Sequence, residues 1–234
     1  MLHQLWIPAI AYLAATATAA SLPDTQVLLA PPEPGTHIPA LQIPSEEEAA
    51  TVARTLVQRE SLTNINTIRK IHQDDGTTRA LPFSAMEYYA DCDEDGDPYW
   101  LAVDIGTTFQ NLRQGSDVSF TIRVGDHPAW DEVNATYPGG IEQSPAGSPR
   151  INLSGRLNWV PFKTPFDYIR LQACFLKRHP DAVAWLPGSY GSPHSSRWAK
   201  LEVDAIYFVG GFGDRAYIGA IDPELYHAAD VIEL

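Results

Sequence analysis

The sequence is short of cysteine, of basic side chains and of long apolar runs, and each shortage excludes a class of protein. Its 234 residues include two cysteines and 16 Lys and Arg against 29 Asp and Glu, for a net charge of −13. Two cysteines are too few for a miniprotein held together by several disulfides and too few for a zinc site with four thiolate ligands. An acidic surface repels phosphate backbones and anionic lipid, so general nucleic-acid binding is excluded. A hydrophobic content of 44% excludes wholesale disorder, and the length suits one ordinary domain.

The sequence also lacks several motifs that are typical of enzymes. The chain has no G-x-S-x-G nucleophile elbow, no H-x-x-x-H pair and no C-x-x-C pair. Its histidines are scattered, and two of them, His127 and His179, precede prolines at the expected ends of elements, where a cap or a surface position is typical. No pair of carboxylates stands out for acid–base work. We therefore predict no catalytic residue and no metal site.

The one long uncharged run lies at the start of the chain. Residues 5–20 carry no charged side chain, and the Ala-Thr-Ala triplet at 17–19 offers the small residues that a signal peptidase reads. The run is too short for a membrane span, which needs ~20 apolar residues. We predict a signal peptide over residues 1–20, a proline-rich extended leader over 21–44, and no membrane span in the mature protein. The expected location is the secretory route, ending outside the cell or in an endolysosomal or vacuolar lumen.

Two acceptor sequences for N-glycosylation agree with that route. Asn134 and Asn152 each begin an N-x-S/T triplet without proline, and we predict a glycan on both, with Asn152 pointing outward from a strand. Cys92 and Cys174 would meet oxidising conditions there, and their even number permits one disulfide. Two separate thiols are the alternative, because the sequence cannot place two Cα atoms within the ~7 Å that a disulfide needs.

Capping signals place two helices. Ser45 and Glu48 form a capping box, and the apolar residues that follow fall on one helical face. A second helix begins at Thr164, with Pro165 at its first position, and stops at Pro180. The apolar spacing predicts that the inner face of this second helix consists of Phe166, Ile169, Ala173 and Leu176.

The rest of the chain has the patterns of strands. Short runs alternate between apolar and polar residues and are separated by Gly, Pro and Asp. The expected strands cover about 62–68, 81–90, 99–105, 117–124, 151–160, 200–209 and 215–220. In the fifth run, the residues predicted to point inward are Ile151, Leu153, Leu157 and Trp159. This pattern predicts a mainly β (α+β) fold, a closed or nearly closed antiparallel barrel with peripheral helices, over residues 45–230.

Two further segments resemble ligand-binding loops. Residues 91–97, D-C-D-E-D-G-D, place acids at positions 1, 3 and 5 of a calcium loop and glycine at position 6, but position 12 is Ala102 and both flanks read as strand. A solvated hairpin turn is the favoured interpretation, and a calcium site is the alternative. Residues 211–216 match G-x-G-x-x-A, yet too little chain follows for a dinucleotide fold. The glycines there indicate a tight bend or close strand contact.

Six short motifs follow one another in an order that carries a family resemblance. They are A-R-T-L-V at 53–57, G-D-P at 96–98, N-L at 111–112, L-S-G at 153–155, F-x-x-x-H-P at 175–180 and V-G-G-F-G at 209–213. In this order they resemble the CREG family, the cellular-repressor glycoproteins, within the wider group of pyridoxamine 5′-phosphate oxidase-like split barrels. The resemblance covers about residues 45–230, nearly all of the mature chain.

The resemblance implies a six-stranded antiparallel split β-barrel of the FMN-binding type, as a homodimer whose cofactor groove lies at the subunit interface. Oxidases of the wider group hold FMN there through Arg, Lys, Ser and Thr on adjacent strands. The CREG branch is a non-enzymatic glycoprotein branch that has lost flavin. Haem-handling relatives carry a histidine just before the N-L motif, where residues 107–110 have none. The glycine motif at 209–213 is nevertheless closer to the cofactor-handling relatives.

From the residues and the resemblance together we expect a CREG-like dimer without catalytic activity or cofactor, which acts by binding a protein or a small ligand. The alternatives are an FMN-dependent oxidoreductase and a module that holds flavin or haem without turnover. Arg123 and Arg156 could meet around an FMN phosphate if their strands are neighbours. Arg69, Lys70 and Arg79 lie near the first hairpin. For all five, a solvated side chain is the favoured interpretation.

Overall fold

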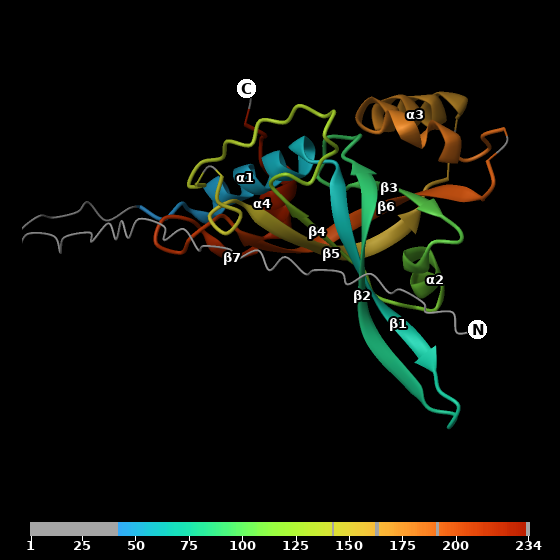
Figure 1. The fold of residues 1–234 in the computed structure, drawn as a ribbon. Helices are drawn as coiled ribbons and strands as arrows, with labels where there is room; N and C mark the ends of the chain where they lie inside the picture. The colour runs from blue at the N-terminus through green and yellow to red at the C-terminus, as the bar shows by residue number, and fades with distance from the viewer. Residues whose placement is uncertain (1–41, 142, 162–163, 191, 233–234) are drawn as a thin grey trace, which may run out of the picture. The chain divides into compact units, whose positions relative to one another are not determined.

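The computed structural model describes residues 42–232 except 142, 162–163 and 191, so the predicted signal peptide and nearly all of the predicted leader lie outside the described residues (Figure 1). Seven antiparallel strands form one sheet in the order β3-β2-β1-β4-β5-β6-β7. They are β1 (Leu62–His72), β2 (Thr78–Ala90), β3 (Tyr99–Val103), β4 (Ser119–Arg123), β5 (Arg150–Trp159), β6 (Ser196–Val209) and β7 (Ile218–Ile221). Because β3 also pairs with β6, six strands close on themselves and β7 is added beside β6. The predicted six-stranded barrel is thus confirmed.

Helices surround this barrel. In the described part of the chain they are α1 (Glu46–Arg59), α2 (Thr107–Arg113), α3 (Pro165–Arg178), α4 (Pro223–Ala228) and the 3-10 helix η1 (Pro180–Trp185). The predicted capping box at Ser45 and Glu48 is confirmed, with both reciprocal hydrogen bonds present. Helix α2 is missed by the sequence patterns, which continue the third strand to residue 105 instead. It follows Gly106 and has no side-chain cap, so the sequence carries no start signal there.

The core lies between α1 and the inward faces of the strands. The predicted inner face of α1 is buried, and so are the alternate residues of β4 and β5. These buried strand residues are Phe120, Ile122, Ile151 and Leu153. Trp159 was predicted to point inward but is 42% exposed, because β5 ends there and the ring rests against Phe109 of α2, with the centroids 5.5 Å apart.

Helix α3 packs by a different face from the predicted one. Phe166 and Ile169 are 72% and 61% exposed, while Leu171 and Phe175 are buried. Leu171 and Phe175 belong to a second apolar cluster on the outer side of β2 and β3, which also holds Tyr99. The helix carries two apolar stripes, and the partner surface on the strands decides which one is buried.

Two glycines allow close approaches that shape the barrel. A β-carbon on Gly155 would lie 1.9 Å from the carbonyl oxygen of Glu202, at the point where the β5–β6 register shifts. Gly211 has φ +151°, and a β-carbon there would lie 2.9 Å from the carbonyl oxygen of Gly147. The predicted tight bend between the last two strands is therefore confirmed, and it depends on glycine.

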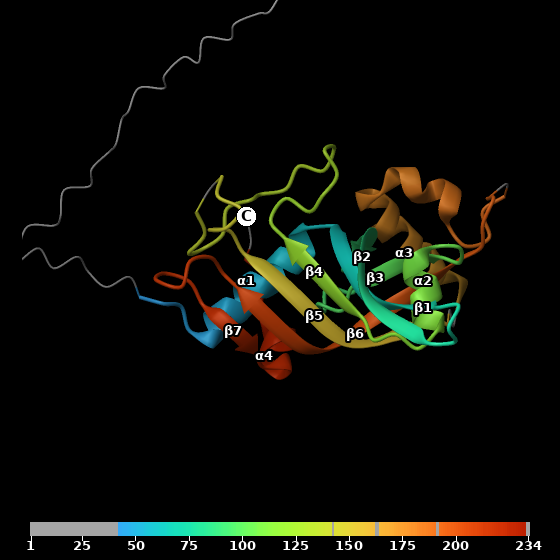
Figure 2. The same ribbon diagram turned by 60° about the horizontal axis from the view of Figure 1, so that its bottom comes forward.

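The β1–β2 hairpin continues beyond the barrel, and residues 72–80 at its tip are exposed (Figure 1). Figure 2 shows β1, β4, β5 and β6 side by side, which places their outer faces on one continuous surface. Within the described residues, none of the helices has both the length and the apolar character needed to cross a bilayer.

Candidate functional site

Uncharged polar side chains gather on the outer surface of three neighbouring strands. We call this set the polar face: Asn66 on β1, Ser119 and Thr121 on β4, and Asn152 and Ser154 on β5. Strand alternation puts them there, because the residues between them on β4 and β5 point into the core. The register places Ser119 directly opposite both Asn66 and Ser154, and Thr121 opposite Asn152.

Two side-chain amides hold the two hydroxyls of β4 from either side. The Nδ2 atom of Asn66 donates to Thr121 Oγ1 at 2.8 Å and to Ser119 Oγ at 3.2 Å. The Nδ2 atom of Asn152 donates to the same two oxygens at 3.0 Å and 3.1 Å. Ser154 Oγ donates to Asn152 Oδ1 at 3.3 Å. The network is neutral and its partners come from three strands, so it forms only when the sheet is assembled.

A groove of about 430 Å³, called the polar groove below, runs beside the polar face, toward the β1–β2 hairpin. Its polar side is formed by Asn66, Ser119 and Ser154, and its apolar side by residues of the hairpin such as Ile68 and Phe83. The one charged residue in its lining is acidic, Asp117. Such a surface suits carbonyl, amide or hydroxyl groups and offers no cation to a phosphate.

A second hollow, of about 300 Å³, lies against β2 and β3 beside η1. We call it the apolar hollow. It is lined by Met86, Glu87, Tyr88, Leu101, Val103, Trp185 and His194. The Tyr88 ring stacks on His179 at 4.3 Å and meets Trp185 edge-on at 6.2 Å, while its hydroxyl donates to Asp181 at 2.9 Å. Flat apolar groups fit this surface better than charged ones.

Glu87 is a carboxyl group that the sequence patterns did not single out. Burial raises its pKa, and the hydrogen bonds that it accepts from Thr108 Oγ1 at 2.8 Å and Trp100 Nε1 at 3.3 Å partly offset this rise. Both donors are fixed on neighbouring elements. This group is therefore engaged in holding α2 and β3 rather than poised toward a ligand.

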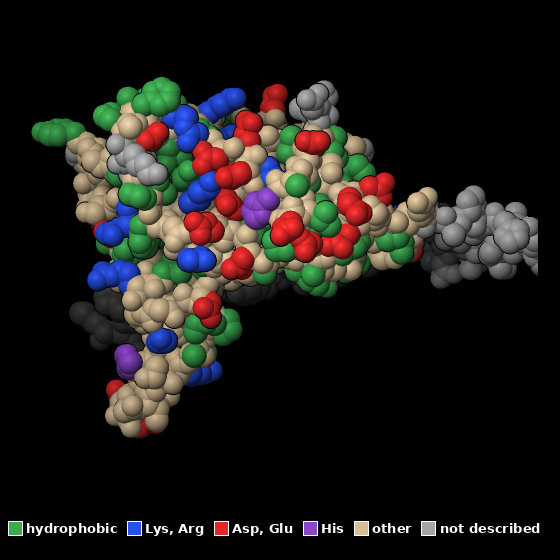
Figure 3. All heavy atoms as spheres, turned by 180° about the vertical axis from the view of Figure 1, so that it is seen from behind, with side chains coloured by type: hydrophobic (Ala, Val, Ile, Leu, Met, Phe, Trp, Pro, Cys, Tyr) green, Lys and Arg blue, Asp and Glu red, His purple; other side chains and the backbone are tan. Residues whose placement is uncertain are grey.

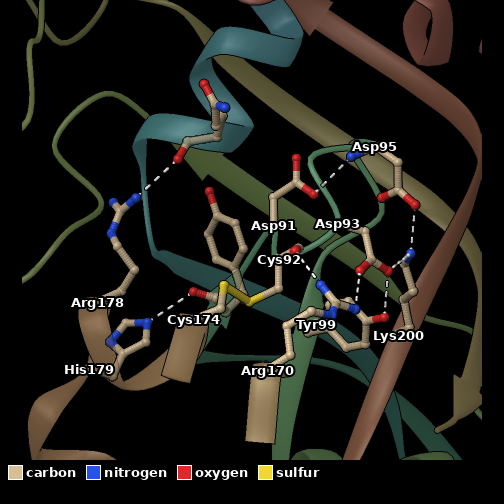
Figure 4. The surroundings of a disulfide bond; sticks show 12 residues. Asp91, Cys92, Asp93, Asp95, Tyr99, Arg170, Cys174, Arg178, His179 and Lys200 are labelled. Atoms are coloured by element: carbon tan, nitrogen blue, oxygen red, sulfur yellow. Dashed lines mark hydrogen bonds and ion pairs between the residues drawn. A yellow bond between two sulfur atoms is a disulfide. The ribbon is translucent and has the colours of Figure 1, made fainter. Parts of the chain in front are cut away.

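The loop between β2 and β3, residues 91–98, is called the acidic loop below. The predicted hairpin connection is confirmed, because β2 and β3 pair on either side of it, but its solvation is not, because four of its five acids have partners within the chain. Asp93 accepts from Arg170 and Lys200 at 2.7 Å and from the Tyr99 hydroxyl at 2.6 Å (Figure 4). Lys200 Nζ also reaches Asp95 at 2.6 Å. Burial opposes ionisation of Asp93, but these hydrogen bonds outweigh it and hold the pKa at about 2.

The Lys200 ammonium therefore lies between two loop carboxylates, as a calcium ion would in the alternative interpretation. Within the described ranges, no group of three or more His, Cys, Asp or Glu side chains is placed to hold a metal. Asp97 is oriented elsewhere, since it accepts from the Val203 backbone N–H at 2.9 Å and contacts His227 at 3.1 Å.

Asp91 is the buried member of the acidic loop. Its side chain is fully shielded and lies 4.0 Å from Arg54, whose own side chain is 3% exposed. Burial raises the pKa of Asp91 to about 6, although Arg54 acts to lower it. Arg54 also donates to the Glu94 carbonyl at 2.6 Å and lies over the Tyr226 ring at 5.4 Å. This contact ties the loop to α1 and α4.

Cys92 and Cys174 join the acidic loop to α3. Their sulfur atoms are bonded at 2.01 Å and their Cα atoms are 5.8 Å apart (Figure 4). Both cysteines line an open hollow of about 530 Å³ that also includes Asn134 and Arg178. On the molecular face seen in Figure 3, acidic and basic side chains intermix over one half of the surface, whereas the other half carries mainly acidic ones.

The basic residues considered for a phosphate do not meet. Arg123 pairs with Asp126 at 3.0 Å, whereas Arg156 is exposed and lies 4.0 Å from Glu202. The β4–β5 register puts Arg123 opposite Arg150, far along β5 from Arg156. Of the three basic residues on the first hairpin, which are all exposed, Lys70 donates to the Gln114 carbonyl at 2.8 Å. These residues are Arg69, Lys70 and Arg79.

The two histidines before prolines lie deeper than surface caps. His179 caps α3 as predicted but is fully buried, and its Nε2 lies 2.9 Å from the Tyr89 carbonyl. Burial lowers its pKa, which the hydrogen bond to Tyr89 partly offsets. His127 Nδ1 contacts the buried carboxylate of Glu60 at 2.7 Å. Both histidines bind main-chain or buried groups, which only the folded chain brings near them.

Comparison with known proteins places the fold. A haem-binding protein from Mycobacterium smegmatis superposes with a TM-score of 0.55 at 20% identity, covering 81% of this chain and 63% of that protein. The chain therefore spans less than two thirds of that protein's length. A protein of unknown function from Agrobacterium tumefaciens gives a TM-score of 0.48 at 19% identity, covering 80% and 63%. A putative pyridoxamine 5′-phosphate oxidase from Listeria innocua gives 0.40 at 11% identity, covering 71% and 98%.

Sequence comparison is more specific. The family model described as "CREG, beta-barrel" matches residues 44–228, most of the chain. No curated protein matches the chain.

Proposed function

The chain belongs to the CREG β-barrel family, and on that premise we propose that it acts by binding, as a secreted or endolysosomal, N-glycosylated homodimer without catalytic activity. The split barrel is a scaffold in this proposal, and its outer strand surfaces carry the binding. The partner is a protein or an uncharged polar small molecule, because these match the amide and hydroxyl groups of the polar face.

The observation that carries this proposal is the absence of free cations from the described linings of the polar groove and the apolar hollow. Each lining includes an acid, Asp117 or Glu87, and neither includes Lys or Arg. Arg197, on β6, is held by both oxygens of Asp104 at 2.9 Å and 3.1 Å. A flavin phosphate carries about two negative charges and needs such cations. The residues that line the polar groove and the apolar hollow do not fit FMN.

The buried carboxyl groups also argue against acid–base catalysis. Glu87, Asp91 and Glu60 are the shielded acids, and each accepts hydrogen bonds from groups fixed in the fold. Asp91 and Glu60 line neither the polar groove nor the apolar hollow, and Glu87, which lines the apolar hollow, already accepts from Trp100 and Thr108. A general acid or base must reach a proton on the substrate, and these groups are already committed.

The dimer is supported by apolar surface around the closed strands. Met86, Ile105 and Trp159 are 56%, 64% and 42% exposed, and Ile68 in the polar groove is 37% exposed. A second copy that covers these side chains would remove them from water. The secretory route is supported by the disulfide, which persists in oxidising compartments, and by the two glycosylation sequences.

One observation favours a second function, the holding of a flat aromatic cofactor such as haem without turnover. The apolar hollow combines the rings of Tyr88 and Trp185 with the imidazole of His194, a side chain that can ligate iron. In this alternative the hollow would hold a haem edge and His194 would contact the metal.

Light scattering and visible absorbance test the proposal together. The purified protein is expected to have the mass of a dimer and to retain no visible band after incubation with FMN and removal of the excess. A monomer contradicts the association, and a retained flavin band contradicts the cofactor-free part. Incubation with haemin tests the second function, which requires a Soret band that the His194→Ala variant loses.

A further inference from the structure

We propose that the folded protein carries its N-linked glycan on Asn134, and that Asn152 stays unmodified because its amide belongs to the polar face. The inference rests on the proposed secretory route and goes beyond it by distinguishing two acceptor sequences that look alike in the chain. It also decides which surface of the barrel a glycan shields.

Asn134 presents the geometry of an accessible acceptor. It lies in the long loop between β4 and β5, and its side chain is exposed. Its Oδ1 accepts from the Thr136 backbone N–H at 2.8 Å, which holds the triplet in a tight local turn. Glycans are attached to Nδ2, and within the described part of the chain the Nδ2 atom of Asn134 has no hydrogen-bond partner. A sugar can therefore be added there without loss of a contact.

Asn152 presents the opposite geometry. It lies in the middle of the sheet, with Thr121 of β4 on one side and Tyr207 of β6 on the other, and it is half-buried. Both bonds that it makes to β4, at 3.0 Å and 3.1 Å, come from the Nδ2 atom that a glycan would occupy. A glycosylated amide keeps a single N–H, so at least one bond is lost and the sugar must displace the hydroxyls beside it.

Transfer of a glycan precedes folding, so the amide is free when the enzyme meets the nascent chain. The selection acts afterwards, because a chain modified at Asn152 cannot complete the network across β1, β4 and β5. A sugar on Asn152 must also displace the Ser119 and Thr121 hydroxyls, which lie 3.1 Å and 3.0 Å from its Nδ2 atom. The population that folds and is secreted is therefore the one with a glycan on Asn134 alone. Its glycan lies beside the hollow that holds the Cys92–Cys174 disulfide, and the polar face stays bare for a partner.

Two substitutions, each of which removes the hydroxyl of one acceptor triplet, test which asparagine carries the glycan. Thr136→Ala and Ser154→Ala each destroy an acceptor sequence and keep the asparagine. The turn at Asn134 survives Thr136→Ala because its donor is a backbone N–H. The full chain is expressed in a secretory host behind the signal sequence of that host, and the mass of the secreted protein is measured before and after endoglycosidase treatment. Thr136→Ala is expected to abolish the whole mass shift, and Ser154→Ala to leave it unchanged.

Peptide mass spectrometry of the wild-type protein gives a readout that depends on no variant, since enzymatic release of the glycan converts a modified Asn to Asp. Conversion at residue 134 alone is the expected result. Conversion at residue 152, or a shift that persists in Thr136→Ala, overturns the inference and leaves the proposed glycoprotein intact. A wild-type protein without any shift overturns both.

Discussion

The polar face and the acidic loop satisfy their polar groups in opposite ways. On the polar face, neutral amides and hydroxyls of three neighbouring strands bond to one another, as Asn66 does with Thr121 at 2.8 Å. In the acidic loop, carboxylates are matched by cations from distant elements, such as Lys200 from β6 and Arg170 from α3. One region is therefore open to uncharged partners, whereas the charges of the other are largely used up inside the chain.

The difference shows which surfaces of an acidic protein remain free to bind a partner. The chain has a net charge of −13 and therefore few basic side chains, and three of them, Arg54, Arg170 and Lys200, are paired with carboxylates of the acidic loop. Among the described residues, the linings of the polar groove and of the apolar hollow contain no Lys or Arg. These two sites therefore offer no cation to a phosphate.

Breaking the buried charge contact is expected to have the largest effect. Arg54→Met leaves Asp91 shielded from water with no cation, and removal of one partner of a buried pair costs about 4 kcal/mol. The free energy of unfolding is measured in urea. Arg123→Met is the matched control, because its pair with Asp126 has an arginine side chain that is 68% exposed, and it should cost below about 1 kcal/mol. Equal losses in the two variants would contradict the contrast.

Removal of the disulfide is expected to have the second largest effect on stability. Replacement of both Cys92 and Cys174 by Ser removes the covalent link between the acidic loop and α3 and opens a covalent loop of 82 residues, at a cost of about 3 kcal/mol. Urea unfolding of the wild-type protein with a strong reductant serves as the control and should show the same loss. A reduced protein as stable as the oxidised one would show that the ionic contacts of the loop suffice by themselves.

Breaking the neutral network of the polar face is expected to cost less stability than removing the buried charge contact or the disulfide. Asn66→Ala removes one of the two amides that hold Ser119 and Thr121, and the loss of these bonds costs about 1.5 kcal/mol. Asn64→Ala is the control on the same strand, because Asn64 is exposed and outside the network, and it should change stability little. If both variants unfold at the same urea concentration, the network does not stabilise the sheet.

The smallest expected effect is a dependence on pH. The pKa of Asp91 is about 6 in the folded protein against 3.8 ordinarily, so the folded state binds this proton more tightly. Its stabilising contribution is complete below pH 3.8 and is lost as the pH rises through 6. We expect the free energy of unfolding to rise by about 1 kcal/mol from pH ~7.5 to pH ~5.5.

Other groups modify this pH dependence. Burial raises the pKa values of Glu60 and Glu87, which adds to the rise at acidic pH, and it lowers the pKa of His179, which opposes the rise. Asp91→Asn should therefore remove most, but not all, of the rise. Urea unfolding at the two pH values measures it, and a wild-type protein that loses stability toward pH ~5.5 would contradict the assignment.

Local signals in the sequence predicted much of the fold. The capping residues Ser45 and Thr164 mark the starts of α1 and α3, and alternation marks the faces of β4 and β5. The same reasoning failed where two patterns compete or none is present. Helix α3 has two apolar stripes and buries the one around Phe175, while α2 begins without a side-chain cap.

The candidate sites were less predictable, because their members meet across long stretches of chain. The acidic loop reads as a solvated turn, since the chain gives no sign that Lys200 lies beside it. Asn134 and Asn152 have the same triplet pattern, yet one amide is free and the other is bonded to β4. Arg123 and Arg156 are both on polar strand faces, but the register keeps them apart.

The sequence by itself determined the apolar spacing, the buried faces and the caps of most elements, because these depend on residues close together in the chain. It also contained the order of motifs that identifies the family. The tertiary structure decided which charges meet. Closure of the barrel pairs Tyr99 of β3 with Lys200 of β6, and this register brings the ammonium to Asp93, 107 residues earlier. Interaction energies fall steeply with distance, so the partner of a side chain is fixed only when the strands have closed.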